Sequence, residues 1–478
     1  MNSSLPLAER LACWSAQQTF EQLPSEVVHE VKRRVIDSLG CALGAWDSDT
    51  ARVAREFALA SPQANGATVF GTAQRSAPDA AAFANGAMVR YLDFNDTYLS
   101  KEPAHPSDNI STCLAVAESE GRSGRDLILA IAIAYEVQCR LCDACSIRAL
   151  GWDHVTYGSY SATLACAKLM NLSVEQTVHA LGIAGTTGNY LRQSRAGELS
   201  MWKGAAFAAA ARNAVFATQL ARLGMTGPAP IFEGQFGFFN EVSGPFELPP
   251  LAGEDPSRRW MILDTYIKKW PVEYHAQSAV DAALELRKEL TDKGLTEQEI
   301  RDQVVVLVDT YSPAYVEIRT FDACADIIAD PPKWNPTTRE SADHSLPYCV
   351  AAALLDGDVT LETFDEARLA DPQLRALMQV IRVNRDDECN AGYPAGIPNE
   401  VEITLSDGAT LRRRVDFPRG HARNPMSDEE VEAKFRQLAT RWMSEARIAE
   451  ALEGLWHLDE IERVSAVLAF FVEITKVG

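Results

Sequence analysis

Residues 91–109 hold the densest group of chemically useful side chains in the chain. The segment reads YLDFNDTYLSKEPAHPSDN, and its acids, amides, hydroxyls and imidazole are Asp93, Asn95, Asp96, Thr97, His105, Ser107, Asp108 and Asn109. An ordinary turn needs polar residues for caps and local hydrogen bonds, but it does not need several acids and a histidine beside two prolines. The pattern indicates a functional site. The alternative is a helix cap followed by a surface turn.

A second histidine and several cations follow in the middle of the chain. His154 precedes a run of small residues typical of a helix, and a helix start with free amide groups can hold an anion. Arg192 and Arg195 come shortly before Lys203, which begins an alanine-rich segment. Because a guanidinium fork fits a carboxylate, we predict a carboxylate-binding cluster here. The alternatives are a structural histidine and a lysine that reaches solvent.

The second half of the chain adds polar candidates around two motifs, KKWPVEYHAQ and ADHSLPY. They are Lys268, Lys269, His275, Gln277, His344 and Tyr348. The two lysines precede a Trp-Pro pair, where a solvated pair on a linker is the simpler interpretation. His344 could equally cap the apolar helix that follows it.

Three cysteines have the spacing C-x2-C-x2-C at Cys139, Cys142 and Cys145, which superficially matches the start of an iron–sulfur motif. The motif lies in an apolar, helix-like segment and has no fourth cysteine nearby. We therefore predict structural cysteines and no metal.

Composition limits the class of protein. A chain of 478 residues exceeds the size at which a single core keeps growing, so two domains are expected. The net charge of -21 argues against a nucleic-acid partner, and an anionic substrate would need a local group of cations. Neither an apolar run of about 20 residues nor a secretory signal is visible, so we expect a cytoplasmic protein without a membrane partner.

Hydrophobic periodicity predicts helices over residues 79–92, 124–150, 158–169 and 203–223, and a further helix from about residue 25 that ends at Gly40. Strands are expected at 303–309 and in a hairpin over 399–417, which turns at 406–408. Ser427, followed by three acids, marks the start of another helix.

The chain resembles the MmgE/PrpD family, which includes 2-methylcitrate dehydratases and cis-aconitate decarboxylases. The resemblance rests on LDFNDT and HPSDN, and on longer matches at 151–169, 195–214, 268–283, 342–357 and 419–435. It implies a mainly α fold with a large all-helical domain and a smaller α+β lid domain. The implied division is 1–265 for the first part of the helical domain, 266–421 for the smaller domain, and 422–478 for helices that return to the first.

The resemblance also implies which side chains act. The catalytic candidates are Asp93, Thr97, His105, His154, Lys203 and Lys268. We predict a substrate-binding role for Arg192, Arg195, Lys269, His275, Gln277, His344 and Tyr348. Lys268 aligns better than Lys269 with a functional lysine of the family, and the acid and base are not distinguished.

The resemblance implies a metal-independent hydro-lyase without a cofactor, which dehydrates 2-methylcitrate, citrate or a related hydroxy acid in propionate catabolism. Proton loss next to a carboxylate needs cations to stabilise the charge, and departure of hydroxide needs a general acid. The resemblance implies that Gln277 favours dehydration, because the decarboxylase branch of the family has histidine at this position. Decarboxylation, epimerisation of a dicarboxylate and non-catalytic binding are the alternatives, and the family implies a homodimer.

Overall fold

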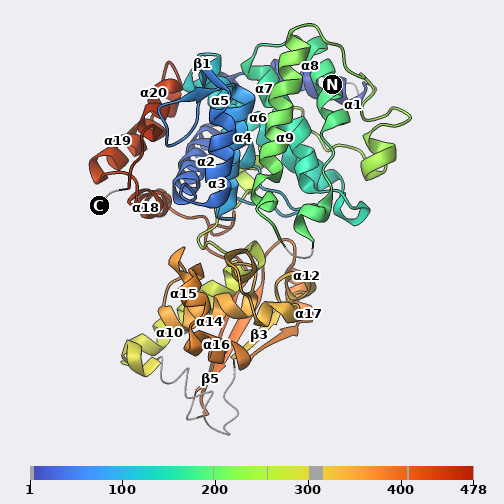
Figure 1. Cartoon of the computed structure of the whole chain (residues 1–478). Helices are drawn as coiled ribbons and strands as arrows, with labels where there is room; N and C mark the ends of the chain where they lie inside the picture. Colours follow the sequence, from blue (N-terminus) through green and yellow to red (C-terminus); the bar gives the residue numbers. More distant parts are fainter. Residues whose placement is uncertain (1–4, 197–198, 256, 301–315, 406–407, 477–478) are drawn as a thin grey trace. The chain divides into compact units, whose positions relative to one another are not determined.

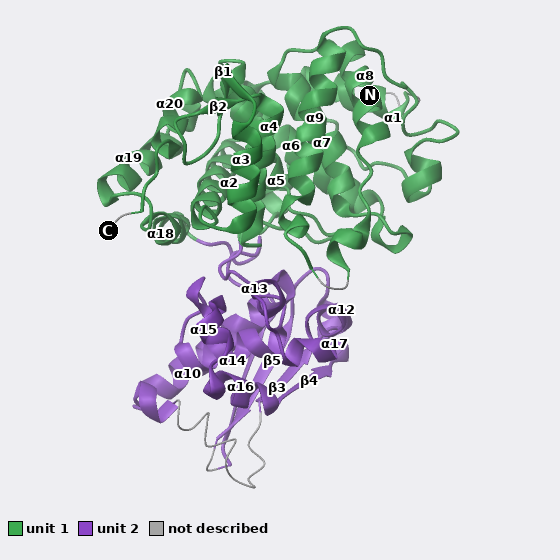
Figure 2. Ribbon diagram, in the orientation of Figure 1, with its two compact units in different colours: residues 1–267, 427–478 green, residues 268–426 purple. Residues whose placement is uncertain are grey.

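The computed structural model describes residues 5–196, 199–255, 257–300, 316–405 and 408–476. These form two compact units, shown in Figure 2: unit 1 comprises Met1–Ile267 and Ser427–Gly478, and unit 2 comprises Lys268–Met426. The chain therefore leaves unit 1 once and returns to it. The units divide after Ile267 and after Met426, and the boundaries expected from the sequence, at residues 266 and 421, stay a prediction for the domains.

Unit 1 is built from helices, with one small antiparallel pair of strands, β1 and β2 (Figure 1). Its elements are α1 (Leu7–Gln17), α2 (Ser25–Gly44), α3 (Asp49–Leu59), β1 (Pro62–Thr68), β2 (Arg75–Ser76), α4 (Pro78–Tyr91), α5 (Asp108–Ser119), α6 (Gly124–Ala144), α7 (Gly158–Leu169), α8 (Val174–Thr187), α9 (Trp202–Arg222), α18 (Asp428–Ala439), α19 (Glu445–Trp456) and α20 (Ser465–Leu468). The predicted mainly α fold is confirmed. None of the described helices is long and apolar enough to cross a membrane.

The centre of unit 1 is a layer of alanine-rich helices in which α9 packs against α4, α7 and α8. Small side chains let these helices approach closely, and α9 buries most of its alanines. At the start of α7, a Cβ on Gly158 would lie 2.5 Å from the Phe207 ring of α9. Only glycine fits this contact without movement of the ring. The small residues of these helices therefore indicate close helix packing.

Helix ends show where local sequence misleads. The expected end of α2 at Gly40 is wrong, because the helix continues to Gly44. A Cβ at Gly40 would lie 3.2 Å from Cδ2 and 3.3 Å from Cα of Phe435 in α18, so this glycine serves a close helix contact. The predicted helix over 124–150 also ends early, because Cys145 is extended (φ −149°, ψ 161°) and a short 3-10 helix, η2 (Arg148–Leu150), follows.

A buried lysine holds α18, the first helix after the chain returns to unit 1, against α2. α18 begins at the predicted cap, where Ser427 and Glu430 form a capping box. Farther along α18, Lys434 Nζ lies 2.6 Å from Asp37 Oδ1 of α2 and donates to the Phe94 carbonyl at 2.7 Å. Lys434 and Asp37 are both buried, so this cation joins α18, α2 and the segment after α4.

Unit 2 combines helices with a mixed four-stranded sheet of order β4-β3-β5-β6. Its elements are α10 (Gln277–Asp292), β3 (Val316–Thr320), α12 (Asp322–Ile328), α13 (Arg339–Ala342), α14 (Leu346–Asp356), α15 (Glu366–Leu369), α16 (Pro372–Gln379), β4 (Ile381–Arg385), α17 (Asp387–Gly392), β5 (Asn399–Thr404) and β6 (Thr410–Val415). β3 pairs in parallel with β4 and antiparallel with β5, and α10 packs against β5 and β6.

The predicted hairpin is confirmed, because β5 and β6 pair from Asn399↔Val415 to Thr404↔Thr410. Inward residues alternate along β5, as expected for a strand with one buried face. The predicted strand at 303–309 lies outside the described residues, as do two of the turn residues at 406–407.

We predict that Lys434→Met destabilises the protein by roughly 3–5 kcal/mol, because it leaves the Asp37 carboxylate buried without its cation. Urea unfolding measured by circular dichroism tests this. Arg436→Met is the matched control on the same helix; its exposed ion pair with Glu445 should contribute less than about 1 kcal/mol. Equal effects of the two substitutions would contradict the role given to Lys434.

Candidate active site

The segment between α4 and α5 is held by one buried carboxylate, Asp96. Its Oδ1 accepts the Ser107 amide at 2.9 Å, and its Oδ2 accepts the Tyr135 hydroxyl of α6 at 2.7 Å. Arg34 of α2 places its Nε 3.6 Å from the same carboxylate, whose side chain has no exposed surface. The Asp96 carbonyl accepts His105 Nδ1 at 2.8 Å. Asp96 therefore sets the fold of the segment that carries the candidate chemistry.

His105 is held in one tautomer by its two partners. Arg90 Nη2 lies 2.9 Å from His105 Nε2, and a guanidinium can only donate, so Nε2 accepts. The hydrogen is then on Nδ1, which donates to the Asp96 carbonyl. Arg90 also donates from Nη1 to Asp93 at 2.6 Å. Arg90 is thus central to the group, although the sequence analysis did not include it.

Asp93 connects this segment to α9. Its backbone has φ +51°, a left-handed conformation that is uncommon outside glycine and is found at functional sites. Its carboxylate lies between Arg90 and Lys203, whose Nζ donates to Oδ2 at 3.2 Å. The structure therefore brings Asp93, His105 and Lys203 together around Arg90, and their catalytic roles stay predictions.

His154 lies beside this group at the start of η3 (His154–Tyr157), and its ring centroid is 5.6 Å from that of His105. Its Nδ1 lies 2.9 Å from Asp153 Oδ1, so the hydrogen is on Nδ1 and Nε2 carries a lone pair. Nε2 is buried and has no hydrogen-bond partner in the described part of the chain. Burial and the nearby Arg195 lower the pKa of His154, and the Asp153 charge opposes them only in part.

The two candidate arginines differ. Arg195 Nε donates to both oxygens of Asp153, at 3.0 and 2.9 Å, whereas Arg192 is exposed and donates to the Arg148 carbonyl at 3.4 Å. Although burial alone would raise the pKa of Asp153, Arg195 and His154 hold it well below the usual range. Arg195 therefore belongs to the His154 group and Arg192 does not. Asp153 was missed by the sequence analysis, although it precedes His154 directly.

Asp108 was named in the 91–109 segment but was not chosen as a catalytic candidate. It begins α5, accepts from Asn95 Nδ2 at 2.8 Å, and lies with Oδ2 3.8 Å from Arg90 Nε. Burial raises the pKa of Asp108 to about 7, against the opposing charge of Arg90. A carboxyl group with this pKa can exchange protons near neutral pH.

Thr97 has a local structural contact in this arrangement. Its hydroxyl donates to the Ala104 carbonyl at 3.1 Å, and its backbone pairs with Tyr266. These bonds close the segment into a compact loop. A catalytic role for Thr97 stays a prediction.

Unit 2 contains a separate group of candidate side chains. Lys268 is 1% exposed, and His275 Nδ1 lies 2.8 Å from Glu273 Oε1. Although burial opposes it, the charge of His275, with smaller contributions from His344 and Lys268, lowers the pKa of Glu273 to about 2. Glu273 is therefore an anion beside His275, among the candidate residues of unit 2. The role of Lys268 in catalysis stays a prediction.

Two residues of unit 2 that were predicted to contact substrate use their polar groups in hydrogen bonds to the backbone. The Gln277 amide is buried; it donates to the Trp270 and Val272 carbonyls and accepts from the Trp270 amide. The Tyr348 hydroxyl is buried and donates to the Thr363 carbonyl at 2.6 Å. These bonds argue against direct contact with substrate, so Gln277 gives less support to dehydration than its sequence position suggested.

The remaining candidates of unit 2 have simpler surroundings. Lys269 lies with Nζ 5.6 Å from the centroid of the Trp270 ring, and His344 Nδ1 bonds to Asp343. The alternative that His344 caps α14 is wrong, because Ser345 accepts the Tyr348 amide in that position.

The cysteine motif does not form a ligand set. Cys139 and Cys142 lie on α6, while Cys145 follows the helix in extended backbone and contacts the Tyr157 hydroxyl. All three are free thiols. Within the described ranges, no three His, Cys, Asp or Glu side chains are placed to share a metal ion.

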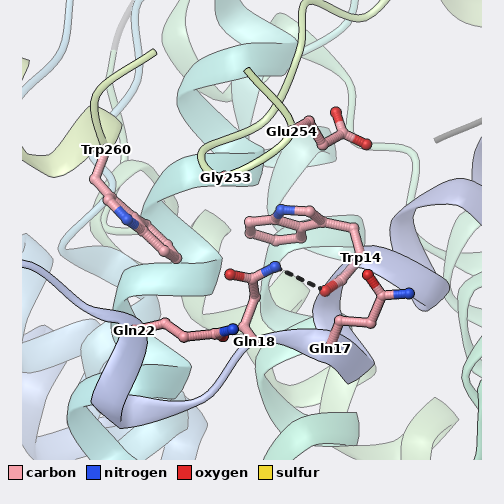
Figure 3. Close-up of a pocket in the computed structure, with 7 residues that line it drawn as sticks. All are labelled: Trp14, Gln17, Gln18, Gln22, Gly253, Glu254 and Trp260. Carbon is pink, nitrogen blue, oxygen red and sulfur yellow. Dashed lines mark hydrogen bonds between the residues drawn. The ribbon is translucent and has the colours of Figure 1, made fainter. Parts of the chain in front are cut away.

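A separate pocket of unit 1, of about 230 Å³, lies between the end of α1 and the residues Gly253, Glu254 and Trp260 (Figure 3). Its lining residues are Trp14, Gln17, Gln18, Gln22, Gly253, Glu254 and Trp260. None of these is a cation, and the Glu254 carboxylate is bound by Arg10 at 2.6 Å. This pocket is therefore unsuited to a polycarboxylate.

Comparison with known proteins agrees with the resemblance found in the sequence. The MmgE/PrpD N-terminal domain matches residues 9–250, and the MmgE/PrpD C-terminal domain matches residues 270–458. The chain is 32% identical over 429 residues to a 2-methylcitrate dehydratase of Cupriavidus necator, covering 85% of this chain and 84% of the relative. The corresponding enzyme of Escherichia coli K12 is 29% identical over 423 residues, with 84% of each chain covered.

A human relative, cis-aconitate decarboxylase, is 28% identical over 467 residues, covering 93% of this chain and 90% of the relative. The named relatives are dehydratases and a decarboxylase, which agrees with the predicted enzyme class of lyase. Both domain matches together span most of the sequence, and the chain belongs to the MmgE/PrpD family.

Proposed function

We propose that the protein is a hydro-lyase that removes water from a hydroxy-polycarboxylate, with 2-methylcitrate as the first substrate to test. The observation that carries this proposal is the state of His154: its Nδ1 is bound to Asp153, its Nε2 is buried without a partner among the described residues, and its pKa is lowered. A histidine in this state is a neutral base at neutral pH. The similarity to 2-methylcitrate dehydratases supports the choice of substrate.

The chemistry needs a base, cations and an acid. His154 Nε2 takes the proton from the carbon next to a carboxylate, and the charge that develops on that carboxylate is stabilised by nearby cations. Lys203 and Arg195 supply these cations, and Arg90 holds Asp93 and His105 in place.

Departure of hydroxide requires a proton donor. Asp108 beside Arg90, whose pKa is raised to about 7, can supply it. His105 can supply it only after Nε2 takes up a proton and gives up the hydrogen bond from Arg90. Separate substitution of the two residues distinguishes them, because the alkaline limb of the rate profile disappears only when the acid that causes it is removed. The Lys268 group of unit 2 and the expected homodimer stay predictions.

The reaction is tested with 2-methylcitrate, citrate and cis-aconitate as separate substrates. We expect loss of water from 2-methylcitrate, with appearance of a conjugated alkene seen by absorbance and mass spectrometry. Loss of carbon dioxide from cis-aconitate without dehydration would instead assign the activity named for the human relative. Binding without turnover of any substrate would contradict an enzymatic function.

The pH profile tests His154. Because the pKa of His154 is below the ordinary value, its base form persists to lower pH, and kcat/KM should fall only below about pH 6.5. His154→Asn should reduce kcat roughly 100-fold or more and remove this acid limb. His179→Asn, a histidine of α8 that bonds Gly227, is the matched control. Retention of the acid limb in His154→Asn would exclude His154 as the base.

Lys203 is tested by Lys203→Met, which should lower kcat/KM roughly 100-fold or more, because a charge that stabilises the developing anion is lost. The control is Lys293→Met, which removes an exposed lysine paired with Glu289. Thermal unfolding of both variants separates catalytic loss from loss of folded protein. A change below threefold at Lys203 would remove it from the reaction.

The two candidate proton donors are compared with Asp108→Asn and His105→Asn. If Asp108 is the acid, the unsubstituted enzyme loses activity above about pH 7, and Asp108→Asn abolishes that limb together with most of kcat. If His105 is the acid, Asp108→Asn keeps the shape of the profile and His105→Asn does not.

A further inference from the structure

Asp153 is the point at which two potential substrate contacts meet. The carboxylate is fully buried and accepts His154 Nδ1 at 2.9 Å, the Val155 amide at 3.3 Å and Ser194 Oγ at 2.6 Å. Arg195 Nε completes the set with bonds to both oxygens. A carboxylate with this many donors keeps its charge and its orientation.

The backbone explains why Arg195 reaches this carboxylate from 42 residues away. Trp152 and Leu191 form an antiparallel bridge, the Asp153 amide donates to the Tyr190 carbonyl, and the Arg192 amide donates to the Gly151 carbonyl. This short pairing places η4 (Arg192–Arg195) beside the start of η3. Asp153 then joins the two turns through side chains.

His154 and Arg195 each keep a buried polar atom that Asp153 does not bind. His154 Nε2 and Arg195 Nη2 are both buried, and neither has a hydrogen-bond partner in the ranges that the structure describes. Buried polar groups are normally paired, and leaving one unpaired costs free energy. One atom is a proton acceptor and the other a cationic donor, and the same carboxylate orients both.

We propose that Asp153 is a positioning residue that fixes His154 as a proton acceptor, and that Arg195 determines specificity by binding a substrate carboxylate through Nη2. This rests on the proposed function and deepens it. The site then favours acids in which a carboxylate lies close to the carbon that loses its proton. Asp153 itself touches no substrate; it acts through the two side chains that it holds.

The molecule offers a matched pair for the test. Arg212 of α9 binds Asp79 of α4 through Nε at 3.3 Å, which repeats the Arg–Asp pairing at an exposed position. Asp79→Asn and Arg212→Met therefore make the same chemical changes as Asp153→Asn and Arg195→Met without touching His154.

The first experiment measures the His154 ring directly by nitrogen NMR on histidine-labelled protein, with His154→Asn used to assign the signal. We expect the tautomer with hydrogen on Nδ1. In Asp153→Asn the lost negative charge should lower the pKa of His154 further and reduce the population of this tautomer, whereas Asp79→Asn should change neither. A wild-type tautomer with hydrogen on Nε2, or an unchanged His154 in Asp153→Asn, would overturn the positioning role.

The second experiment measures binding of tricarballylate, which has three carboxylates and no hydroxyl group to lose, by calorimetry. Arg195→Met should weaken binding at least tenfold, and Arg212→Met should leave Kd within about twofold. Equal affinities for Arg195→Met and the unsubstituted protein, or no binding to the latter, would remove Arg195 from substrate recognition.

Turnover measurements test the role of Asp153 and the proposed hydro-lyase function separately. With an active substrate, Asp153→Asn should lower kcat roughly 100-fold and move the acid limb of kcat/KM to lower pH, a shift that a purely structural role would not produce. If the unsubstituted protein turns over no polycarboxylate, the proposed function fails while NMR and calorimetry still decide the inference. If turnover is normal in Asp153→Asn, the inference fails and the function stands.

Discussion

Burial of the Asp96 carboxylate is the constraint on which the candidate site depends. Burial raises the pKa of Asp96, and a buried carboxyl group is tolerated only when other groups replace its water. Arg34 supplies an opposing charge, and Ser107 and Tyr135 supply hydrogen bonds. Arg34 lies in α2, Ser107 directly precedes α5, and Tyr135 lies in α6. The segment between α4 and α5 can therefore fold only when these helices are assembled. The position of His105 follows, because its Nδ1 bonds to the Asp96 carbonyl.

Charge in the candidate site is organised as ion pairs, which makes a net charge of -21 compatible with the proposed anionic substrate. Lys203 and Arg90 share Asp93, and Arg195 binds Asp153. Each carboxylate fixes the position of a cationic side chain. The same contact sets the direction of the N–H donors that the carboxylate does not bind. Local geometry thus supplies positive donors where the overall composition is strongly acidic.

The helical scaffold of unit 1 depends on close contacts made by small residues. Gly40 permits the approach of Phe435, and Gly158 permits the approach of Phe207. Lys434 then connects α18 to Asp37 and to the Phe94 carbonyl, which lies two residues before Asp96. Residues near the C-terminus therefore support the same segment that the N-terminal helices enclose.

The amino-acid sequence by itself determined the mainly α fold, the hairpin of β5 and β6, and the family. Through the family resemblance it also named Asp93, His105, His154 and Lys203 as candidates, whose roles stay predictions. Periodicity and motifs are local properties, and these features are encoded locally. The tertiary structure decided what each side chain contacts: it added Arg90 and Asp153, separated Arg195 from Arg192, and committed the Gln277 amide to backbone groups. Hydrogen-bond partners and burial depend on which distant segments meet, and that is set by packing of the whole unit and not by spacing along the chain.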